Sequence, residues 1–337
     1  MIQKVNIVII VSLNEKCGKC EKMFYCGKDC QEKDWKQHGL ECKIFKEFII
    51  EKELSRFLLR LYLFTNRYTD SRHEQYKFGE NNYSNRCFND LMKHCQQIKS
   101  DENLMMIFQS LCAEYESFNI KFDENILFEC FCIIRINCFP IYYCPANKIG
   151  MGIYIAESQL NHSCAPNAIV IFDKCHIVIQ AIDTIKLDEQ ITISYLDLKS
   201  PKKIRRKKLE QYYYFICECK RCEQRETFND WKKFHQLFNK FSELFNGKKW
   251  LESYQIGIEI YAMMKYIYNQ CHPELIIFTT MMIKIRMELL SSDSIVEENI
   301  EINCQLYATI DYFNKHSSSI MKNYLKSIRN DIFHPSN

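Results

Sequence analysis

The chain has 337 residues, 47% of them hydrophobic and 26% charged, and its formal net charge is +3. This composition excludes a wholly disordered chain, and the small net charge gives no reason to expect a nucleic-acid partner from charge alone. Gly and Pro number only 8 and 6, which favours helices over a turn-rich all-β chain. The 19 cysteines include Cys-x-x-Cys pairs, which indicate metal-bound thiolates in a reducing compartment.

The N-terminal part carries a short apolar block at residues 5–13, with the sequence VNIVIIVSL. Crossing a bilayer needs about 20 apolar residues, so neither this block nor any other run of the sequence predicts a transmembrane helix. Its branched residues favour a β-strand. A displaced start of the coding sequence is one alternative. A signal peptide is another, but no small-residue cleavage site follows the block.

The cysteine and histidine residues between positions 17 and 42 have the spacing of zinc ligands. They form Cys-x2-Cys, Cys-x3-Cys and His-x3-Cys steps at Cys17, Cys20, Cys26, Cys30, His38 and Cys42. Zinc takes four such ligands in a tetrahedron, and residues four apart share one face of a helix, which we expect over residues 31–40. A disulfide knot is the alternative, and the lack of secretory signals weighs against it.

With its Phe24-Tyr25-Cys26 and Asp34-Trp35 positions, this cluster resembles the MYND zinc finger. The resemblance implies one zinc held by Cys17, Cys20, His38 and Cys42. A second zinc would use Cys26 and Cys30 with an earlier cysteine pair, and no cysteine precedes Cys17. Either the start of the sequence has been lost, or these two residues stay as thiols. The family's finger recruits proline-containing peptides or DNA, which are the partners that the resemblance implies.

Helical spacing dominates on both sides of a β-rich block. Residues 43–118 are predicted to be helical with a loop at 65–89, and the cysteines near this region are read as small core side chains: Cys87, Cys95, Cys112, Cys130 and Cys132. Branched and aromatic runs predict strands at residues 133–141, 169–172, 177–181 and 190–195. Beyond residue 223, three amphipathic helices are predicted around residues 251–261, 275–289 and 302–313. This order makes the fold class α+β.

Five motifs inside and after the β-rich block resemble the catalytic core of SET-domain protein lysine methyltransferases. They are NCFPI (137–141), GMGIY (150–154), SQLNHSCAPN (158–167), ITISYLD (191–197) and CECKRC (217–222). Together with the finger, they make the chain similar to the SET-and-MYND subfamily. The resemblance implies a SET-type β core with a pseudoknot, an inserted MYND finger and an α-helical, TPR-like C-terminal bundle.

The same resemblance implies protein-lysine methylation with S-adenosylmethionine as the methyl donor. The cofactor would be contacted by Asn137, Ser158, Asn161, His162, Tyr195 and Phe215. Tyr195 would also be the catalytic residue at the end of the lysine channel. A further zinc would be bound by Cys164, Cys217, Cys219 and Cys222. Methyl transfer from a sulfonium depends on positioning, and a buried channel favours the neutral amine that the reaction needs.

The family places a SET segment with a Gly-x-Gly strand ahead of the finger. Here the sixteen residues before Cys17 contain no glycine, so we expect that segment to be absent. The alternative function is therefore a catalytically impaired adaptor that binds peptides through its finger and C-terminal helices. Asp188 also stands where the family commonly has a turn glycine.

The predicted organisation is an N-terminal remnant (1–16), a MYND finger (17–42), a helical SET insert (43–125), a SET core (126–200), a post-SET zinc-binding segment (201–222) and a helical C-terminal domain (223–337). The basic run at residues 202–208 is read as a solvated helix face, with a nuclear-import or nucleic-acid patch as the alternative. We expect a cytoplasmic or nuclear monomer, without a membrane partner, that acts on a protein or peptide lysine, histones included.

Overall fold

The computed structural model describes residues 7–10, 15–25, 27–48, 50–73, 75–77, 85–144, 147–173, 176–226, 228–291, 300–319 and 321–326. The chain divides into two compact units. Unit 1 comprises Met1–Gln159, Lys174–His176 and Tyr212–Tyr214; unit 2 comprises Leu160–Asp173, Ile177–Gln211 and Phe215–Asn337. None of the described helices is both long and apolar enough to cross a membrane.

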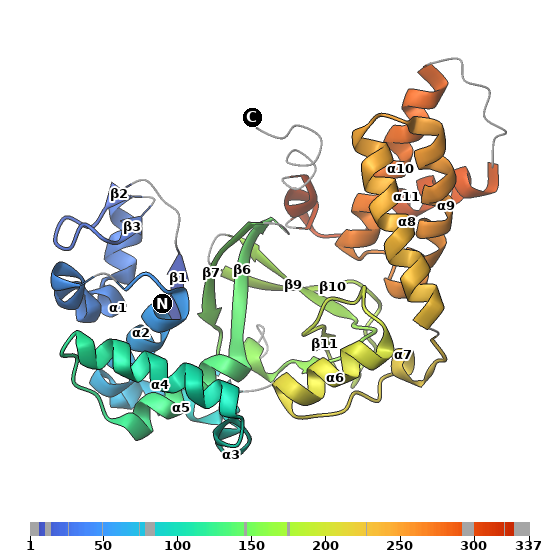
Figure 1. The fold of residues 1–337 in the computed structure, drawn as a ribbon. Helices are drawn as coiled ribbons and strands as arrows, with labels where there is room; N and C mark the ends of the chain where they lie inside the picture. The colour runs from blue at the N-terminus through green and yellow to red at the C-terminus, as the bar shows by residue number, and fades with distance from the viewer. Residues whose placement is uncertain are drawn as a thin grey trace. The chain divides into compact units, whose positions relative to one another are not determined.

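Unit 1 combines a helical body with short strands (Figure 1). Its helices are α1 (Lys28–Glu47), α2 (Glu53–Arg67), η1 (Thr69–His73), η2 (Phe88–Asp90), α3 (Cys95–Lys99), α4 (Glu102–Ser117), α5 (Glu124–Asn137) and η3 (Glu157–Gln159). Its strands are β1 (Ile7–Ile10), β2 (Glu15–Lys16), β3 (Phe24–Tyr25), β4 (Tyr76–Lys77), β5 (Asn85–Arg86), β6 (Cys138–Cys144) and β7 (Asn147–Ile153). The predicted helix at residues 31–40 is confirmed and is longer at both ends.

The three-stranded sheet of unit 1 has the order β1-β7-β6, with both pairings antiparallel. Ile7 lies opposite Ile153, and Ile10 lies opposite Gly150. The strand predicted in the N-terminal apolar block is therefore confirmed over residues 7–10. The predicted strand at residues 133–141 is wrong in its first half, because α5 continues to Asn137 and β6 begins only at the next residue.

Packing explains why α5 is helical despite its branched residues. Leu127, Phe131 and Ile134 recur at steps of four and three residues and are all buried. The side chain of Asp123 accepts the backbone N–H of Ile126 at 3.0 Å and caps the helix. A continuous helical stripe facing the core outweighs the strand preference of its isoleucines.

The core of unit 1 is centred on α2, whose residues are buried on nearly every side. Phe57, Leu58, Leu59 and Leu61 are inaccessible to solvent, as expected for a helix surrounded by others. Helices α1 and α5 both pack against it. The hydroxyl of Tyr115 on α4 donates to the carbonyl of Ser55 at 2.5 Å. Four of the five cysteines read as core residues lie in or against this core, and Cys87 is buried as well.

Unit 2 contains short strands and a helical C-terminal part. Its strands are β8 (Asn161–His162), β9 (Ala168–Asp173), β10 (His176–Ala181) and β11 (Thr192–Ile193), and its helices are α6 (Lys202–Tyr213), α7 (Lys220–Glu223), α8 (Phe228–Asn246), α9 (Trp250–Ile267), α10 (Pro273–Ser291) and α11 (Ile300–His316). The ends of β10 and α6 are grouped with unit 1. The strands predicted at 169–172 and 177–181 are confirmed, and the one at 190–195 is reduced to β11.

The two small sheets of unit 2 pair β9 with β10 and β8 with β11. The second pair is parallel, with Asn161 opposite Thr192 and His162 opposite Ile193. The hairpin connection predicted at residues 173–175 includes residues 174 and 175, which lie outside the described residues. The pairing of β8 with β11 brings the NHSC and ITISY motifs side by side, while the pseudoknot threading stays a prediction.

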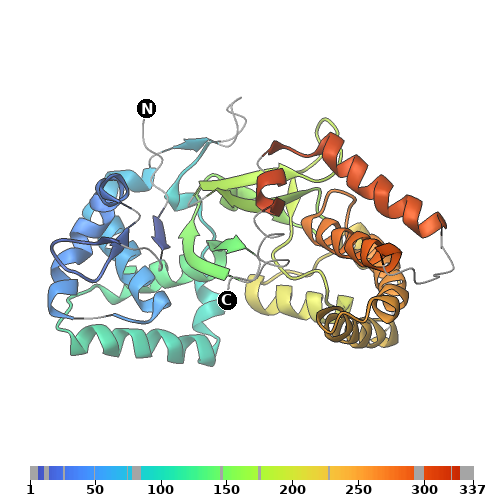
Figure 2. The ribbon, with the colours of Figure 1, turned by 90° about the horizontal axis from the view of Figure 1, so that it is seen from above.

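The C-terminal helices α8 to α11 lie beside one another in chain order (Figure 2). Three helices were predicted beyond residue 223, and α8, which precedes them, was not predicted. Its signal is an aromatic stripe at steps of three and four: Trp231, Phe234, Phe238, Phe241 and Phe245. Gly257 of α9 allows close packing, since a Cβ there would collide with Met282 of α10 and come within 3.1 Å of Phe241.

Candidate functional site

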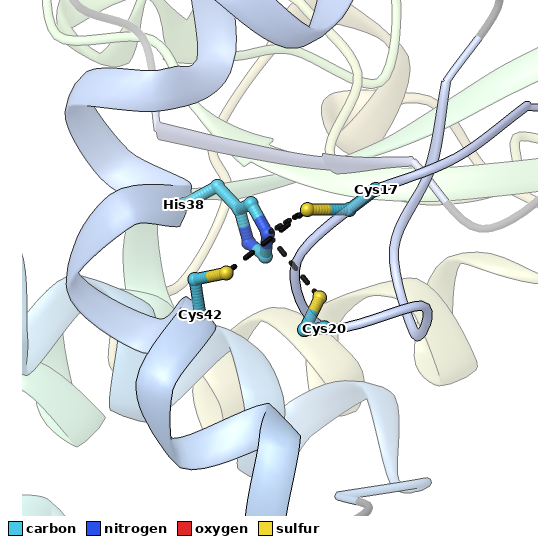
Figure 3. Close-up of side chains that lie close together, drawn as sticks. All are labelled: Cys17, Cys20, His38 and Cys42. Atoms are coloured by element: carbon cyan, nitrogen blue, oxygen red, sulfur yellow. Dashed lines mark hydrogen bonds between the residues drawn. The ribbon is translucent and has the colours of Figure 1, made fainter.

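Two groups of cysteine and histidine side chains within the described residues have the arrangement of metal ligands. The first consists of Cys17, Cys20, His38 and Cys42, all buried, with ligand atoms within 4.8 Å of one another. Cys17 and Cys20 come from the turn between β2 and β3, and His38 and Cys42 come from one face of α1. Figure 3 shows the four side chains pointing toward a common centre.

The distances in this first cluster fit a tetrahedral zinc ion. The Sγ of Cys17 lies 4.0 Å from that of Cys42, and His38 Nε2 lies 3.4 Å from the Sγ of Cys17 and 3.5 Å from that of Cys20. Zinc–ligand bonds of about 2.0–2.3 Å in a tetrahedron place two sulfurs about 3.8 Å apart and a sulfur and a nitrogen about 3.6 Å apart. The cluster of this finger supports zinc.

The local backbone favours the thiolate of Cys17. Burial raises its pKa, but the backbone N–H groups of Cys20 and Lys19 and the His38 ring outweigh burial and lower the pKa to about 6. For Cys42, burial and the neighbouring sulfurs raise the pKa to about 12. Sulfurs this close cannot all ionise in the absence of a cation, and a divalent metal is what permits the four ligands to share the site.

The second nitrogen of His38 is held by a carboxylate. Nδ1 of His38 lies 3.2 Å from Oε1 of Glu41, which is one helical turn further along α1 and has no exposed surface. A carboxylate in this position fixes the tautomer in which Nδ1 carries the proton and Nε2 is the metal donor. Burial raises the pKa of Glu41, but Arg60 and the His38 hydrogen bond outweigh it and lower the pKa to about 2.

Of the other two predicted finger ligands, Cys26 lies outside the described residues. Cys30 is half-buried on α1 and is not a member of either metal-ligand group. A second zinc at these two residues stays a prediction.

The second group consists of Cys164, Cys217, Cys219 and Cys222. Cys164 follows β8, two cysteines follow α6, and Cys222 lies on α7. The Sγ of Cys164 lies 4.0 Å from that of Cys217 and 3.6 Å from that of Cys222, and the backbone N–H of Cys164 donates to the Sγ of Cys219 at 3.3 Å. These separations also suit a tetrahedral zinc, so the predicted four residues do come together.

A buried ion pair stands directly behind this second group. Arg205 donates through Nε to the Sγ of Cys164 at 3.3 Å, and Nη2 lies 3.0 Å from Oε1 of Glu226. Arg221 lies 3.4 Å from the same carboxylate, and the indole N–H of Trp231 donates to it at 3.0 Å. The prediction that residues 202–208 form a solvated face is wrong for Arg205, which is fully buried because it serves this site.

Three of the predicted cofactor-site residues form an aromatic group in unit 2. The ring centroids of His162 and Tyr195 are 5.3 Å apart, and Phe215 lies 6.0 Å from His162 and 6.4 Å from Tyr195. The backbone N–H of Tyr195 donates to Nδ1 of His162 at 3.0 Å. The hydroxyl of Tyr195 donates to the carbonyl of Leu160 at 2.5 Å, so the phenol is held by the chain next to β8.

Burial favours the neutral form of the His162 ring. Burial lowers its pKa to about 4, with the charge of Arg205 adding to the shift and Cys219 opposing it. Since Nδ1 accepts the Tyr195 N–H, the ring's proton lies on Nε2, which is 3.3 Å from the Sγ of Cys164. His162 therefore links the aromatic group to the second cysteine group.

The remaining predicted cofactor residues are Asn137, Ser158 and Asn161, and they belong to different elements. Asn161 is exposed on β8 in unit 2. Ser158 belongs to unit 1, where its hydroxyl donates to the carbonyl of Ile155 at 2.7 Å. Asn137, also in unit 1, donates its amide protons to the carbonyls of Met92 and Ile133 at 2.7 and 2.9 Å. Their contacts with a cofactor stay predictions.

Comparison with known proteins agrees with the geometry of the first cluster. The family described as the MYND finger matches residues 11–42. The chain is 30% identical over 254 residues to the Homo sapiens protein named histone-lysine N-methyltransferase SMYD3, covering 70% of this chain and 56% of the relative. The chain is a MYND-finger protein homologous to the SET-and-MYND proteins.

Two further relatives of this MYND-finger protein show how far the homology extends. The Schizosaccharomyces pombe protein named SET domain and MYND-type zinc finger protein 6 is 31% identical over 63% of this chain and 41% of its own length. The Homo sapiens protein named N-lysine methyltransferase SMYD2 is 29% identical over 63% of this chain and 48% of its own length. The chain thus spans about half the length of the curated relatives it matches.

Sequence reasoning identified the sulfur and imidazole ligands but missed the charged residues behind them. Glu41 carried a usable signal, because it lies three residues after His38 and so on the same helix face. Glu226 and Arg205 carried none that sequence spacing reveals. Their pairing is a tertiary contact between α6 and the segment that joins α7 to α8.

Proposed function

We propose that this chain belongs to an S-adenosylmethionine-dependent protein-lysine N-methyltransferase. The observation that carries the proposal is the aromatic group of His162, Tyr195 and Phe215, joined through His162 to the second cysteine group. The relatives named as histone-lysine and N-lysine methyltransferases support the same activity. S-adenosylmethionine, when bound, would supply a methyl group on a sulfonium, and aromatic rings beside backbone carbonyls suit such a cationic, adenine-containing molecule.

Tyr195 is the residue proposed to act on the substrate amine. Its hydroxyl proton is committed to the carbonyl of Leu160, and a hydroxyl that donates keeps acceptor capacity on its oxygen. The oxygen can accept an N–H of a neutral lysine amine and turn the nitrogen lone pair in one direction. His162 helps to hold the backbone of the same tyrosine in place by accepting its N–H.

The proposed site also favours the neutral form of the incoming amine. Desolvation disfavours an ammonium group, and the neighbouring His162 is itself kept neutral by burial. The positive charge of Arg205, which acts on His162, is paired with Glu226 and Cys164. Zinc at the second cysteine group would hold the segment that follows β8, and with it His162, in place.

Label transfer from radioactive S-adenosylmethionine to a mixed protein substrate tests the proposal. The chain should label lysine, and Tyr195→Phe should lower kcat roughly a hundredfold, as removal of one positioned hydrogen-bonding group does. Zinc content and the thermal transition of the variant should match the parent chain, which separates chemistry from folding. Equal labelling by the parent chain and Tyr195→Phe would reject the assigned role of the tyrosine.

The second candidate is an adaptor that binds peptides through its finger. Phe24 and Trp35 are more than one third exposed, and the Lys19 ammonium lies 4.7 Å from the Trp35 ring. Exposed aromatic side chains suit a proline-containing peptide. Binding of such a peptide that is lost in Trp35→Ala, in a chain that transfers no label, would favour the adaptor over the enzyme.

A further inference from the structure

The polar contacts behind the first cluster continue beyond the finger itself. The matched finger ends at residue 42, whereas Arg60 lies on α2. Arg60 is one of the two largest fully buried side chains among the described residues, with a relative exposure of 2%. A buried arginine is costly unless every part of its guanidinium is paired, so its partners indicate why it is there.

The guanidinium of Arg60 joins two carboxylates of α1. Its Nε donates to Oε1 of Glu41 at 3.1 Å, and its Nη2 reaches the same oxygen. Nη1 and Nη2 donate to the two oxygens of Asp34 at 3.0 and 3.1 Å. Asp34 also accepts the hydroxyl of Tyr25 at 2.8 Å. The arginine is thereby locked between a fixed aspartate and the glutamate that holds His38.

We propose that Arg60 is a positioning residue of the zinc centre, which holds Glu41 so that His38 presents Nε2 to the metal. The MYND finger of this protein would then be complete only with α2, and its metal-binding unit would extend past Cys42 to Arg60.

The charges make Glu41 dependent on Arg60. Glu41 has no exposed surface, and within the described part of the chain its Oε2 accepts no hydrogen bond. Arg56 is the other cation nearby, but its Nη2 is 3.9 Å from Oε1, beyond hydrogen-bond distance. Without Arg60 the carboxylate would be a buried, poorly compensated anion with no partner to hold its position, and it would move and release the His38 N–H.

The geometry also requires an arginine. Asp34 and Glu41 are seven residues apart on one face of α1, and one planar group bridges them with bonds in two directions. A lysine ammonium is a point charge without this fork and would satisfy one carboxylate at a time. Arg60→Lys should therefore retain only part of the zinc affinity of the first cluster that Arg60→Met loses.

The test measures zinc affinity separately at the two clusters of the full chain. Zinc-loaded protein is titrated with a competing chelator, the zinc count is followed by native mass spectrometry, and alkylation of the released thiols shows which cluster was emptied. In Arg60→Met we expect zinc to leave Cys17, Cys20 and Cys42 at least tenfold more readily, the range typical of lost partners behind a ligand histidine. Arg205→Met is the matched control, because it should weaken the second cluster and leave the first unchanged.

A double variant distinguishes positioning from general destabilisation. Glu41→Gln combined with Arg60→Met removes both charges and leaves an amide oxygen that can still accept the His38 N–H. It should hold zinc more tightly than Arg60→Met alone, and its cobalt-substituted absorption spectrum should be close to that of the parent chain. If Arg60→Met does not fold, the double variant should still fold and bind.

Three results would overturn the proposal. They are unchanged zinc release in Arg60→Met, equal weakening of both clusters by that variant, and a double variant no better than Arg60→Met.

Discussion

The two cysteine-containing clusters differ in which charge lies next to the metal ligands and which charge lies behind it. In unit 1, three cysteines and His38 have a carboxylate next to them, Glu41, and an arginine behind it. In unit 2, four cysteines have arginines next to them and a carboxylate, Glu226, behind. The difference follows from the ligands. A zinc-bound imidazole donates a hydrogen bond through its second N–H, whereas thiolate sulfurs accept hydrogen bonds from donors.

The two groups also differ in the net charge that they would carry with zinc bound. Three thiolates and a zinc dication carry one net negative charge, and four thiolates carry two. The more negative group is the one whose sulfur is contacted directly by a guanidinium. In both units one member of the charged pair lies outside the ligand motifs, Arg60 on α2 and Glu226 between α7 and α8, so each metal centre is part of a larger packed region.

Loss of a ligand should have the largest effect. Cys222→Ser should lower the zinc count from two to one and cost unit 2 about 5 kcal/mol or more of stability, since structural metal binding is coupled to folding. The exposed Cys304→Ser is the matched control and should change neither quantity. Native mass spectrometry and urea unfolding measure both. A parent chain that binds no zinc would contradict the assignment of both centres.

Loss of the anion behind the second cluster should have the next largest effect. Glu226→Gln leaves Arg205 and Arg221 buried side by side without their carboxylate, which should cost about 3 kcal/mol. Asp311→Asn breaks an exposed ion pair with Lys315 and should cost less than about 0.5 kcal/mol. Urea unfolding of the two variants compares them directly. Equal changes would show that the buried pair contributes no more than a surface one.

The contribution of the C-terminal helices to stability should depend on pH through His272, independently of the metal centres. Burial lowers the pKa of the half-buried His272 to about 3, with the charge of Lys199 adding to the shift, and its Nδ1 accepts the backbone N–H of Glu274 at the start of α10. Because the folded pKa is below the unfolded value of about 6.5, stability is full above that value and falls as the pH falls toward 3.

Between pH 7 and pH 5, His272 should account for up to about 2 kcal/mol of lost stability. His272→Asn keeps an acceptor for the helix N-terminus but does not titrate. The stability that this variant loses between pH 7 and pH 5 should therefore be smaller than that of the parent chain by the contribution of His272. Acid release of zinc affects both proteins alike and cancels in the difference. The same loss in both proteins would contradict the role of His272.

The smallest effect concerns the cysteine outside the two groups. Cys30→Ser should leave the zinc count at two, because Cys30 lies outside both described ligand groups. Its thermal transition should shift by less than a few degrees, as for a half-buried residue at a helix start. A parent chain that binds three zinc ions and loses one of them in Cys30→Ser would establish a further metal site in the finger that includes Cys30.

Much of the site was predictable because metal ligation depends on residue type and spacing. The two described groups contain eight ligands, and in the second group Cys164 lies 53 residues before Cys217, yet local motifs identified all eight. Asp188 was recognised as occupying a glycine position, and its φ of 64° confirms a left-handed backbone there. Such features are local and therefore visible in the sequence.

The features that sequence reasoning missed depend on long-range packing. Residues 133–137 have strand-like composition but are helical because Leu127, Phe131 and Ile134 fit the core on one face. Arg205 sits in a run of basic residues, and only its position on α6 makes it the fully buried one. Propensity and charge pattern cannot distinguish such a residue from its neighbours.

Calorimetric titration of the chain with S-adenosylmethionine tests the central claim most directly. The account predicts saturable binding of one molecule, weakened at least tenfold by Asn161→Ala, a change at an exposed residue that leaves the fold and the zinc count intact. Absence of binding to the zinc-loaded chain, or equal binding by the parent and Asn161→Ala, would contradict the proposed cofactor site.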